Sequence, residues 1–164
     1  MKKIGFIGTG LMGFPMAKNI LKSGYKLKAF NRTLSKVEAL DEFGAEIAIT
    51  LSELVKDSEI IITMLTDDDA IDEVMGSLNF LDNLKPGSIV IDMSSIKPIT
   101  AKKHEKNLSF KKIKYLDAPV SGGTIGAEEG SLAIMIGGEK KVFKEVEDLL
   151  KTMGNPTLVG PVGS

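Results

Sequence analysis

Three consecutive isoleucines at residues 60–62 constrain the fold of this chain more than any other feature of its sequence. Neighbouring residues of a β-strand point to opposite faces of a sheet, so this run leaves neither face polar. Such a strand is typical of a parallel sheet that helices cover on both sides. Residues 88–92 repeat the pattern with Ile89, Val90 and Ile91. We therefore expect a buried parallel sheet at the centre of the molecule.

Short apolar runs alternate with segments of helical period along the whole chain. The strands are expected at residues 3–7, 26–30, 46–49, 59–65, 88–92, 114–118, 132–136 and 157–159. The helices are expected at residues 11–23, 35–43, 51–56, 67–75, 78–84, 97–108 and 139–153. Because strands and helices alternate, the connections should be right-handed crossovers. The 164 residues therefore predict one α/β domain with a doubly wound, mostly parallel sheet of the Rossmann type.

Composition narrows the classes of partner. The 21 basic and 22 acidic residues nearly cancel, which argues against nucleic acid or an anionic membrane surface as the partner. With no cysteine and one histidine, thiol catalysis and cysteine- or multi-histidine-ligated metals are not expected. Glycines interrupt the apolar stretch after Met1, so a secretory signal is not expected, and no apolar run reaches membrane-spanning length. We expect a cytoplasmic protein with a small-molecule ligand.

A glycine-rich loop follows the first expected strand and opens the first expected helix. It has the pattern G-x-G-x-x-G and reads Gly8-Thr9-Gly10-Leu11-Met12-Gly13. The first glycine permits a tight turn, the second lets the backbone approach a pyrophosphate, and the third allows close packing of helix and strand. The amides at the helix N-terminus favour phosphate charge. The strand, loop and helix together predict a dinucleotide site; the competing interpretation is a set of ordinary turn glycines.

The end of the second expected strand bears on which dinucleotide is bound. An acidic residue about 20 positions after the glycines would bind the ribose 2′-hydroxyl of NAD. The sequence instead reads Asn31-Arg32-Thr33. Asn31 does not repel a 2′-phosphate, Arg32 offers it a cationic fork, and Thr33 adds a hydroxyl donor. These residues predict NADP rather than NAD, with NAD as the alternative cofactor, unless Arg32 simply points into solvent.

Four motifs occur in an order that resembles the β-hydroxyacid dehydrogenase family, which includes 3-hydroxyisobutyrate dehydrogenase and tartronate semialdehyde reductase. The first extends the glycine loop from Phe6 to Ile20, and the second is Ile62-Thr63-Met64-Leu65. The third is the run 91–96, IDMSSI, and the fourth begins at 117–123 with DAPVSGG and continues through residues 126–132. The resemblance covers the whole chain. It implies a cofactor domain that transfers hydride between a nicotinamide and a short hydroxyacid or semialdehyde.

The resemblance also implies roles for residues beyond the glycine loop. Met64 and Leu65 would line the cofactor, and Ser95 would contact its nicotinamide-ribose end. Thr66 stands where the family usually has proline, so the cofactor contact there is expected through the main chain. From the residues alone, Ser94 and Ser95 equally suit a helix cap before Lys97.

Ser121, Gly122 and Gly123 are the candidate substrate anchor. A hydroxyl followed by two glycines presents an O–H group and unshielded amides, which a substrate carboxylate needs. The resemblance implies the same role, and an ordinary turn is the alternative.

The resemblance implies that the family's catalytic lysine lies about five residues beyond Ser164. Residues 1–160 are then expected to form the NADP-binding domain, and residues 161–164 to begin a junction to a helical domain absent from this chain. That helical domain would also make most contacts of a homo-oligomer. The isolated chain is expected to bind cofactor with little or no turnover, because the group that delivers the proton is missing.

Two other interpretations stay open: a non-catalytic NADP-binding module, and an imine reductase-like enzyme. The imine reductase family shares the Asn31-Arg32-Thr33 segment but not the third and fourth motifs.

Three other features have simpler explanations. Asp67, Asp68 and Asp69 suit the start of a helix better than a metal site. His104 is expected to be a solvated side chain on a lysine-rich helix, and Asp117 is expected to be structural.

Overall fold

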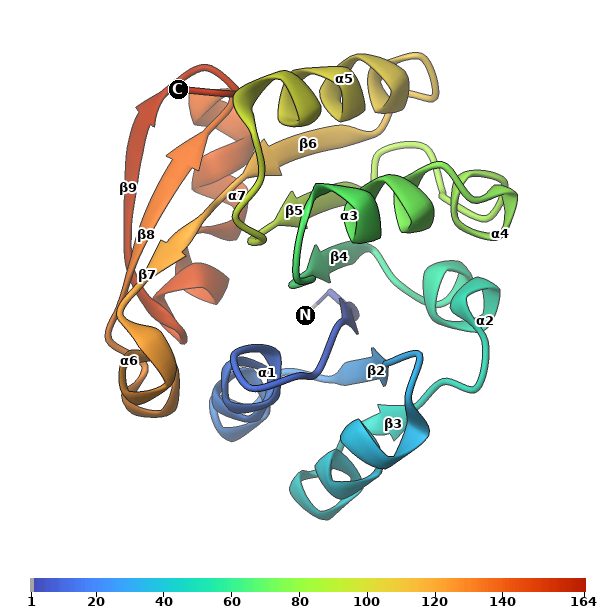
Figure 1. Cartoon of the computed structure of the whole chain (residues 1–164), viewed down its shortest axis with the longest axis vertical. Helices are drawn as coiled ribbons and strands as arrows, with labels where there is room; N and C mark the ends of the chain where they lie inside the picture. The colour runs from blue at the N-terminus through green and yellow to red at the C-terminus, as the bar shows by residue number, and fades with distance from the viewer. Residues whose placement is uncertain (1) are drawn as a thin grey trace.

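The sheet is the centre of the computed structural model, which describes residues 2–164 (Figure 1). Nine strands are found in these residues: β1 (Ile4–Ile7), β2 (Leu27–Phe30), β3 (Glu46–Ile47), β4 (Ile60–Thr63), β5 (Ile89–Asp92), β6 (Lys114–Asp117), β7 (Val120–Ser121), β8 (Leu132–Gly137) and β9 (Gly154–Gly160). Their order is β3-β2-β1-β4-β5-β6-β8-β7, and β9 pairs with β8. The strands from β3 to β6 are parallel, while β8 runs antiparallel to β6 and β7. The predicted mostly parallel α/β sheet is confirmed.

Helices cover both faces of this sheet. They are α1 (Gly13–Lys22), α2 (Leu51–Lys56), α3 (Asp68–Met75), α4 (Leu78–Leu81), α5 (Pro98–Ser109), α6 (Gly123–Glu129) and α7 (Lys140–Lys151), with 3₁₀ turns at Leu34–Lys36 and Glu38–Phe43. Ile60 and Ile62 belong to one core, with residues of α1 and α7, while Ile61 belongs to the other, with residues of α2 and α4. All three isoleucines are at most 5% exposed, so the run at 60–62 is buried on both faces as predicted.

Several predicted boundaries were wrong. The first helix begins at Gly13 rather than Leu11, because the glycine loop still occupies residues 8–12. Residues 34–43 form two 3₁₀ turns instead of one α-helix, and Gly44, in a left-handed conformation, ends the second. The short strand β7 and helix α6 were not predicted, because glycines at 122, 123 and 126 hide the helical period. Strand β9 spans seven residues, not the three predicted.

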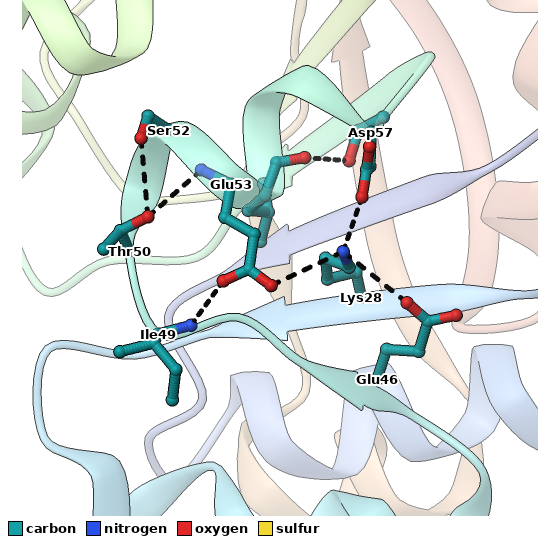
Figure 2. Close-up of polar contacts among 9 residues, drawn as sticks. Lys28, Glu46, Ile49, Thr50, Ser52, Glu53 and Asp57 are labelled. Atoms are coloured by element: carbon teal, nitrogen blue, oxygen red, sulfur yellow. Dashed lines mark hydrogen bonds and ion pairs between the residues drawn. The ribbon is translucent and has the colours of Figure 1, made fainter.

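A charged cluster fixes the edge of the sheet around Lys28 (Figure 2). The Lys28 ammonium lies 2.6 Å from Asp57, 3.5 Å from Glu46 and 3.7 Å from Glu53, and its side chain is 13% exposed. Hydrogen bonding to Asp57 and the neighbouring carboxylates raise the pKa of Lys28 above its ordinary value. Because the three carboxylates come from β3, α2 and the end of α2, the cluster connects these elements to β2.

The last residues pack against the domain. The amide of Gly163 donates to Asp117 Oδ1 at 3.1 Å, and Val162 is 4% exposed within a core cluster. Asp117 therefore makes a structural contact, in line with the expectation for this residue.

Candidate functional site

The glycine loop has three glycines with three different surroundings. Gly8 has a φ of +100°, and a side chain there would overlap the carbonyl of Met64. A side chain at Gly13 would overlap the carbonyl of Gly8, so helix α1 can pack this closely only without one. At Gly10, by contrast, an added Cβ would meet no atom within 4 Å. The loop is therefore packed at its two ends and open at its centre, where a ligand could approach the backbone.

The side chains of Thr9 and Asn31 hold this loop to the end of β2. Asn31 Oδ1 accepts from the Thr9 amide at 3.0 Å, and Asn31 Nδ2 donates to the Thr33 carbonyl at 3.0 Å. The Thr9 hydroxyl donates to the carbonyl of Lys36 at 2.7 Å. Thr9 is 2% exposed, and both its donors are used within the protein. These two side chains position the loop and the residues that follow β2.

A buried carboxyl group organises the loop after β4. Asp92 Oδ1 accepts from the Thr63 hydroxyl and from the Ser94 amide, each at 3.0 Å. Ser94 Oγ in turn accepts from the amide of Leu65 at 2.8 Å. Burial raises the pKa of Asp92 to about 6. Ser94 thus shapes residues 64–66 and is not a helix cap, since the residue before α5 is Lys97 and makes no side-chain cap.

Residues 67–69 start α3, as predicted. Asp67 Oδ1 accepts from the Ala70 amide at 2.9 Å and caps the helix. Asp68 accepts from the Thr100 hydroxyl at 2.6 Å and from the Lys97 amide at 3.0 Å, and these bonds hold its pKa below the usual range. The start of α3 is therefore attached to the start of α5.

The prediction for His104 was wrong. His104 is 4% exposed, and its Nε2 lies 2.7 Å from Asp72 Oδ1. Burial lowers the pKa of His104. The lysines of α5 suggested a solvated helix, but the side of α5 that carries His104 packs toward α3.

A cleft of about 750 Å³, which we call the loop cleft, lies between the glycine loop, the end of β2 and helix α3. It is lined by Ile7, Gly8, Gly10, Phe30, Asn31, Arg32, Lys36, Leu51, Met64, Leu65, Thr66, Asp67, Asp69, Ala70, Glu73, Val74 and Ser77. Seven of the predicted cofactor residues are brought together here: Gly8, Gly10, Asn31, Arg32, Met64, Leu65 and Thr66. These residues come from three separate βα connections, so the fold itself forms the cleft.

Sequence reasoning missed two charged residues of the loop cleft. Lys36 follows Arg32 by four residues in a turn, and that spacing could have indicated a second cation. Glu73 comes from α3 and forms an ion pair with Arg32, with Nη2 and Oε1 2.6 Å apart. No short-range pattern connects residues 32 and 73, because only the packing of α3 brings them together.

The remaining predicted site residues lie outside the lining of the loop cleft. Leu11 is 85% exposed and, with Thr9 and Gly10, lines a neighbouring hollow of about 420 Å³. Met12 and Gly13 lie at the start of α1, Thr33 precedes the first 3₁₀ turn, and Ser95 is exposed after β5.

The candidate substrate anchor lies at the junction of β7 and α6. Ser121, Gly122 and Gly123 are exposed, and both glycines have positive φ, +139° and +62°. Helix α6 packs beside α1, where Asn19 Nδ2 donates to the Ala127 carbonyl at 2.8 Å (Figure 1). The candidate substrate anchor therefore lies at the start of α6, the helix that packs beside α1.

The backbone and the cations that line the loop cleft suit an anionic organic ligand. In the part of the chain that the structure describes, no cluster of three or more His, Cys, Asp or Glu side chains is arranged to hold a metal ion. Among the same residues, no helix combines the length and apolar character needed to cross a bilayer. The open face of Gly10 and the cations Arg32 and Lys36 fit a dinucleotide with its pyrophosphate over the loop.

Known proteins of similar sequence also include nucleotide-binding domains. Residues 3–162 match the family model described as the NAD binding domain of 6-phosphogluconate dehydrogenase. The chain is 43% identical to the uncharacterized oxidoreductase YkwC of Bacillus subtilis, over 99% of this chain and 57% of that protein. It is 41% identical to 2-hydroxy-3-oxopropionate reductase of Escherichia coli, over 98% of this chain and 56% of that protein.

Solved structures of similar fold include a 3-hydroxyisobutyrate dehydrogenase and an imine reductase. A 3-hydroxyisobutyrate dehydrogenase of Mycobacterium tuberculosis, solved with L-serine, superposes with a TM-score of 0.95 at 27% identity, over 99% of this chain and 56% of that one. An imine reductase of Myxococcus stipitatus in complex with NADP+ superposes with a TM-score of 0.92 at 29% identity, over 98% of this chain and 56% of that one. The chain spans little more than half the length of these relatives. It belongs to the family described as the NAD binding domain of 6-phosphogluconate dehydrogenase, and its relatives include proteins named as 3-hydroxyisobutyrate dehydrogenases.

Proposed function

We propose that this chain binds NADP(H) in the loop cleft, in preference to NAD(H), as the cofactor domain of a reductase or dehydrogenase of short β-hydroxyacids and semialdehydes. The arrangement of the three loop glycines carries the proposal. Gly8 and Gly13 leave no room for side chains, whereas Gly10 leaves its backbone open to the cleft. A polar phosphate chain is the ligand that such an open backbone and helix N-terminus suit.

Residues of the loop cleft, together with Thr33 and Ser95 outside its lining, would each contact a different part of the cofactor. Gly10 at the start of α1 would hold the pyrophosphate, and Arg32 and Thr33 would hold the adenosine 2′-phosphate. Residues 64–66, where Ser94 accepts from the Leu65 amide, would line the path toward the nicotinamide, and Ser95 would contact the nicotinamide-ribose end. Arg32 suits a phosphate because its planar fork donates two parallel hydrogen bonds.

The substrate is proposed to bind through its carboxylate at Ser121, Gly122 and Gly123. Ser121, Gly122 and Gly123 are exposed residues, and a hydroxyl and backbone amides are donors of the kind a carboxylate requires. A nicotinamide held beside these residues would supply or accept the hydride at the carbon that bears the substrate oxygen. The matching proton on that oxygen would be exchanged with a lysine, the general acid or base that the resemblance to the β-hydroxyacid dehydrogenase family implies.

An imine reductase is the second candidate. The structural similarity to the Myxococcus stipitatus enzyme favours it. Reduction of a cyclic imine by the full-length protein, with no reduction of C3 or C4 semialdehydes, would establish this alternative.

Titration of the 164-residue chain with NADPH and NADH tests the proposal. The chain has no tryptophan, so nicotinamide fluorescence can be followed with little protein background. NADPH is expected to bind more tightly than NADH, and Arg32→Ala is expected to weaken NADPH binding about tenfold or more while NADH binding changes little. Lys144→Ala, on α7, is the matched control for losing one cation. Equal affinity for both cofactors, or no loss of NADPH affinity in the Arg32 variant, would contradict the NADP assignment.

A further inference from the structure

The loop cleft contains an acidic residue opposite its arginine. In this fold an acid at the end of the second strand commonly binds the ribose 2′-hydroxyl of NAD, and here that position has Asn31 and Arg32. Glu73 reaches the same place from α3, and its carboxylate lies 2.6 Å from the Arg32 guanidinium. Both side chains line the cleft. The acid is therefore present, but a different element supplies it.

The ion pair places Glu73 in competition with a phosphate. Arg32 is the only arginine in the sequence, so one guanidinium has to serve both anions. A 2′-phosphate carries a charge of about −1.5 to −2 near neutral pH. When Arg32 turns to that phosphate, the Glu73 carboxylate loses its partner and stands near a like charge, which disfavours the complex. A 2′-hydroxyl carries no charge and can donate a hydrogen bond to a carboxylate.

The charges around the pair do not cancel this effect. Lys36 is the other cation lining the loop cleft, whereas Asp67 and Asp69 are further acids on the side of α3. Asp67 is engaged in capping its own helix. Hydrogen bonding to Glu73 raises the pKa of Arg32 above its ordinary value.

We propose that Glu73 is a specificity-determining residue that weakens NADPH binding selectively and thereby lets the domain use NADH as well. The inference rests on the proposed function, since it requires the cofactor's 2′ position to lie at Arg32. Asn31 and Arg32 then favour NADP, Glu73 opposes it, and the measured preference is the difference between the two effects. Neutralising Glu73 widens the preference for NADPH.

The test compares the wild-type chain with Glu73→Gln, Arg32→Ala and the control Asp69→Asn by nicotinamide fluorescence. Glu73→Gln is expected to tighten NADPH binding about threefold to tenfold and to change NADH binding less than about twofold. The gain is expected to shrink as salt rises, because the pair is exposed. Asp69→Asn removes the same charge from the same helix without touching Arg32, so its gain is expected to be smaller.

The single arginine provides a second measurement. With ¹⁵N-labelled arginine, the side-chain signal reports Arg32 alone. The signal is expected to differ between wild type and Glu73→Gln before ligand is added, and to become similar in their NADPH complexes, where Glu73 is no longer the partner. NADH is expected to leave the wild-type signal nearly unchanged.

The possible failures are distinguishable. If neither cofactor binds the wild-type chain, the proposed function fails and the inference fails with it. If Arg32→Ala removes the NADPH preference but Glu73→Gln leaves the NADPH-to-NADH ratio unchanged, only the inference is overturned. An equal gain in Asp69→Asn also overturns it, because the general charge of the cleft would then explain the effect.

Discussion

The buried carboxyl group of Asp92 should make the stability of this domain depend on pH in an unusual direction. Asp92 is fully buried at the end of β5, and its Oδ2 atom has no hydrogen-bond partner among the described residues. Burial raises the pKa of the carboxyl from an ordinary 3.8 to about 6. The folded state therefore holds this proton more tightly than the unfolded state, so the stability that the protonated carboxyl contributes is lost as pH rises through about 6.

The size of the effect follows from the shift. A difference of about two pKa units corresponds to about 3 kcal/mol of destabilisation once the carboxyl is ionised in both states. About 2 kcal/mol of this should be lost between about pH 4.5 and pH 8. Asp92→Asn keeps the shape and an acceptor for Thr63 and Ser94 but cannot ionise, so this component should be absent from the variant.

The assay is urea unfolding of wild type and Asp92→Asn across this pH range, followed by circular dichroism. The quantity of interest is the difference between the two curves, because other groups titrate in both proteins. Asp117, whose pKa burial also raises, remains in the variant and contributes to both curves. The variant is expected to gain about 2 kcal/mol relative to wild type as pH rises from 4.5 to 8. A difference that is constant with pH would show that the hydrogen bonds to Asp92 offset its burial, and a change in the opposite direction would show that they outweigh it.

Three further predictions concern packing and charge. Gly13→Ala should destabilise the domain by about 3 kcal/mol or more, because the added methyl overlaps the carbonyl of Gly8; thermal unfolding measures this, and a stable variant would contradict the close packing. Lys28→Met should lower the free energy of unfolding in urea by about 1–2 kcal/mol, because it leaves three carboxylates without their shared cation. The loss should be smaller at high salt, and a loss that does not depend on salt would contradict the electrostatic explanation. Burial lowers the pKa of His104, so the stability that neutral His104 contributes should be lost as pH falls below about 6.5. His104→Gln should lack this loss of stability at low pH, and identical pH profiles of the two proteins in urea unfolding would refute the prediction.

The fold was predictable because its determinants are local. The isoleucine run at 60–62 shows burial on both faces by itself, and the glycine loop shows a strand followed by a helix. Elements whose local signal is weak were missed: β7 is two residues long, and α6 contains several glycines, so tertiary packing against β8 and α1 outweighs their propensity. His104 was misplaced for a similar reason, since a lysine-rich sequence does not reveal which side of a helix meets a neighbour.

Local sequence patterns were enough to predict the parallel sheet, the glycine loop with Arg32 after the next strand, and a dinucleotide site. These follow from periodicity and spacing within a single strand–loop–helix unit. The residue that faces Arg32 and the support of residues 64–66 became visible only in the packed domain. Glu73 and Arg32 are 41 positions apart, and the bond from Leu65 to Ser94 spans 29. Contacts of this kind depend on how neighbouring βα units pack side by side, and no pattern within either unit encodes them.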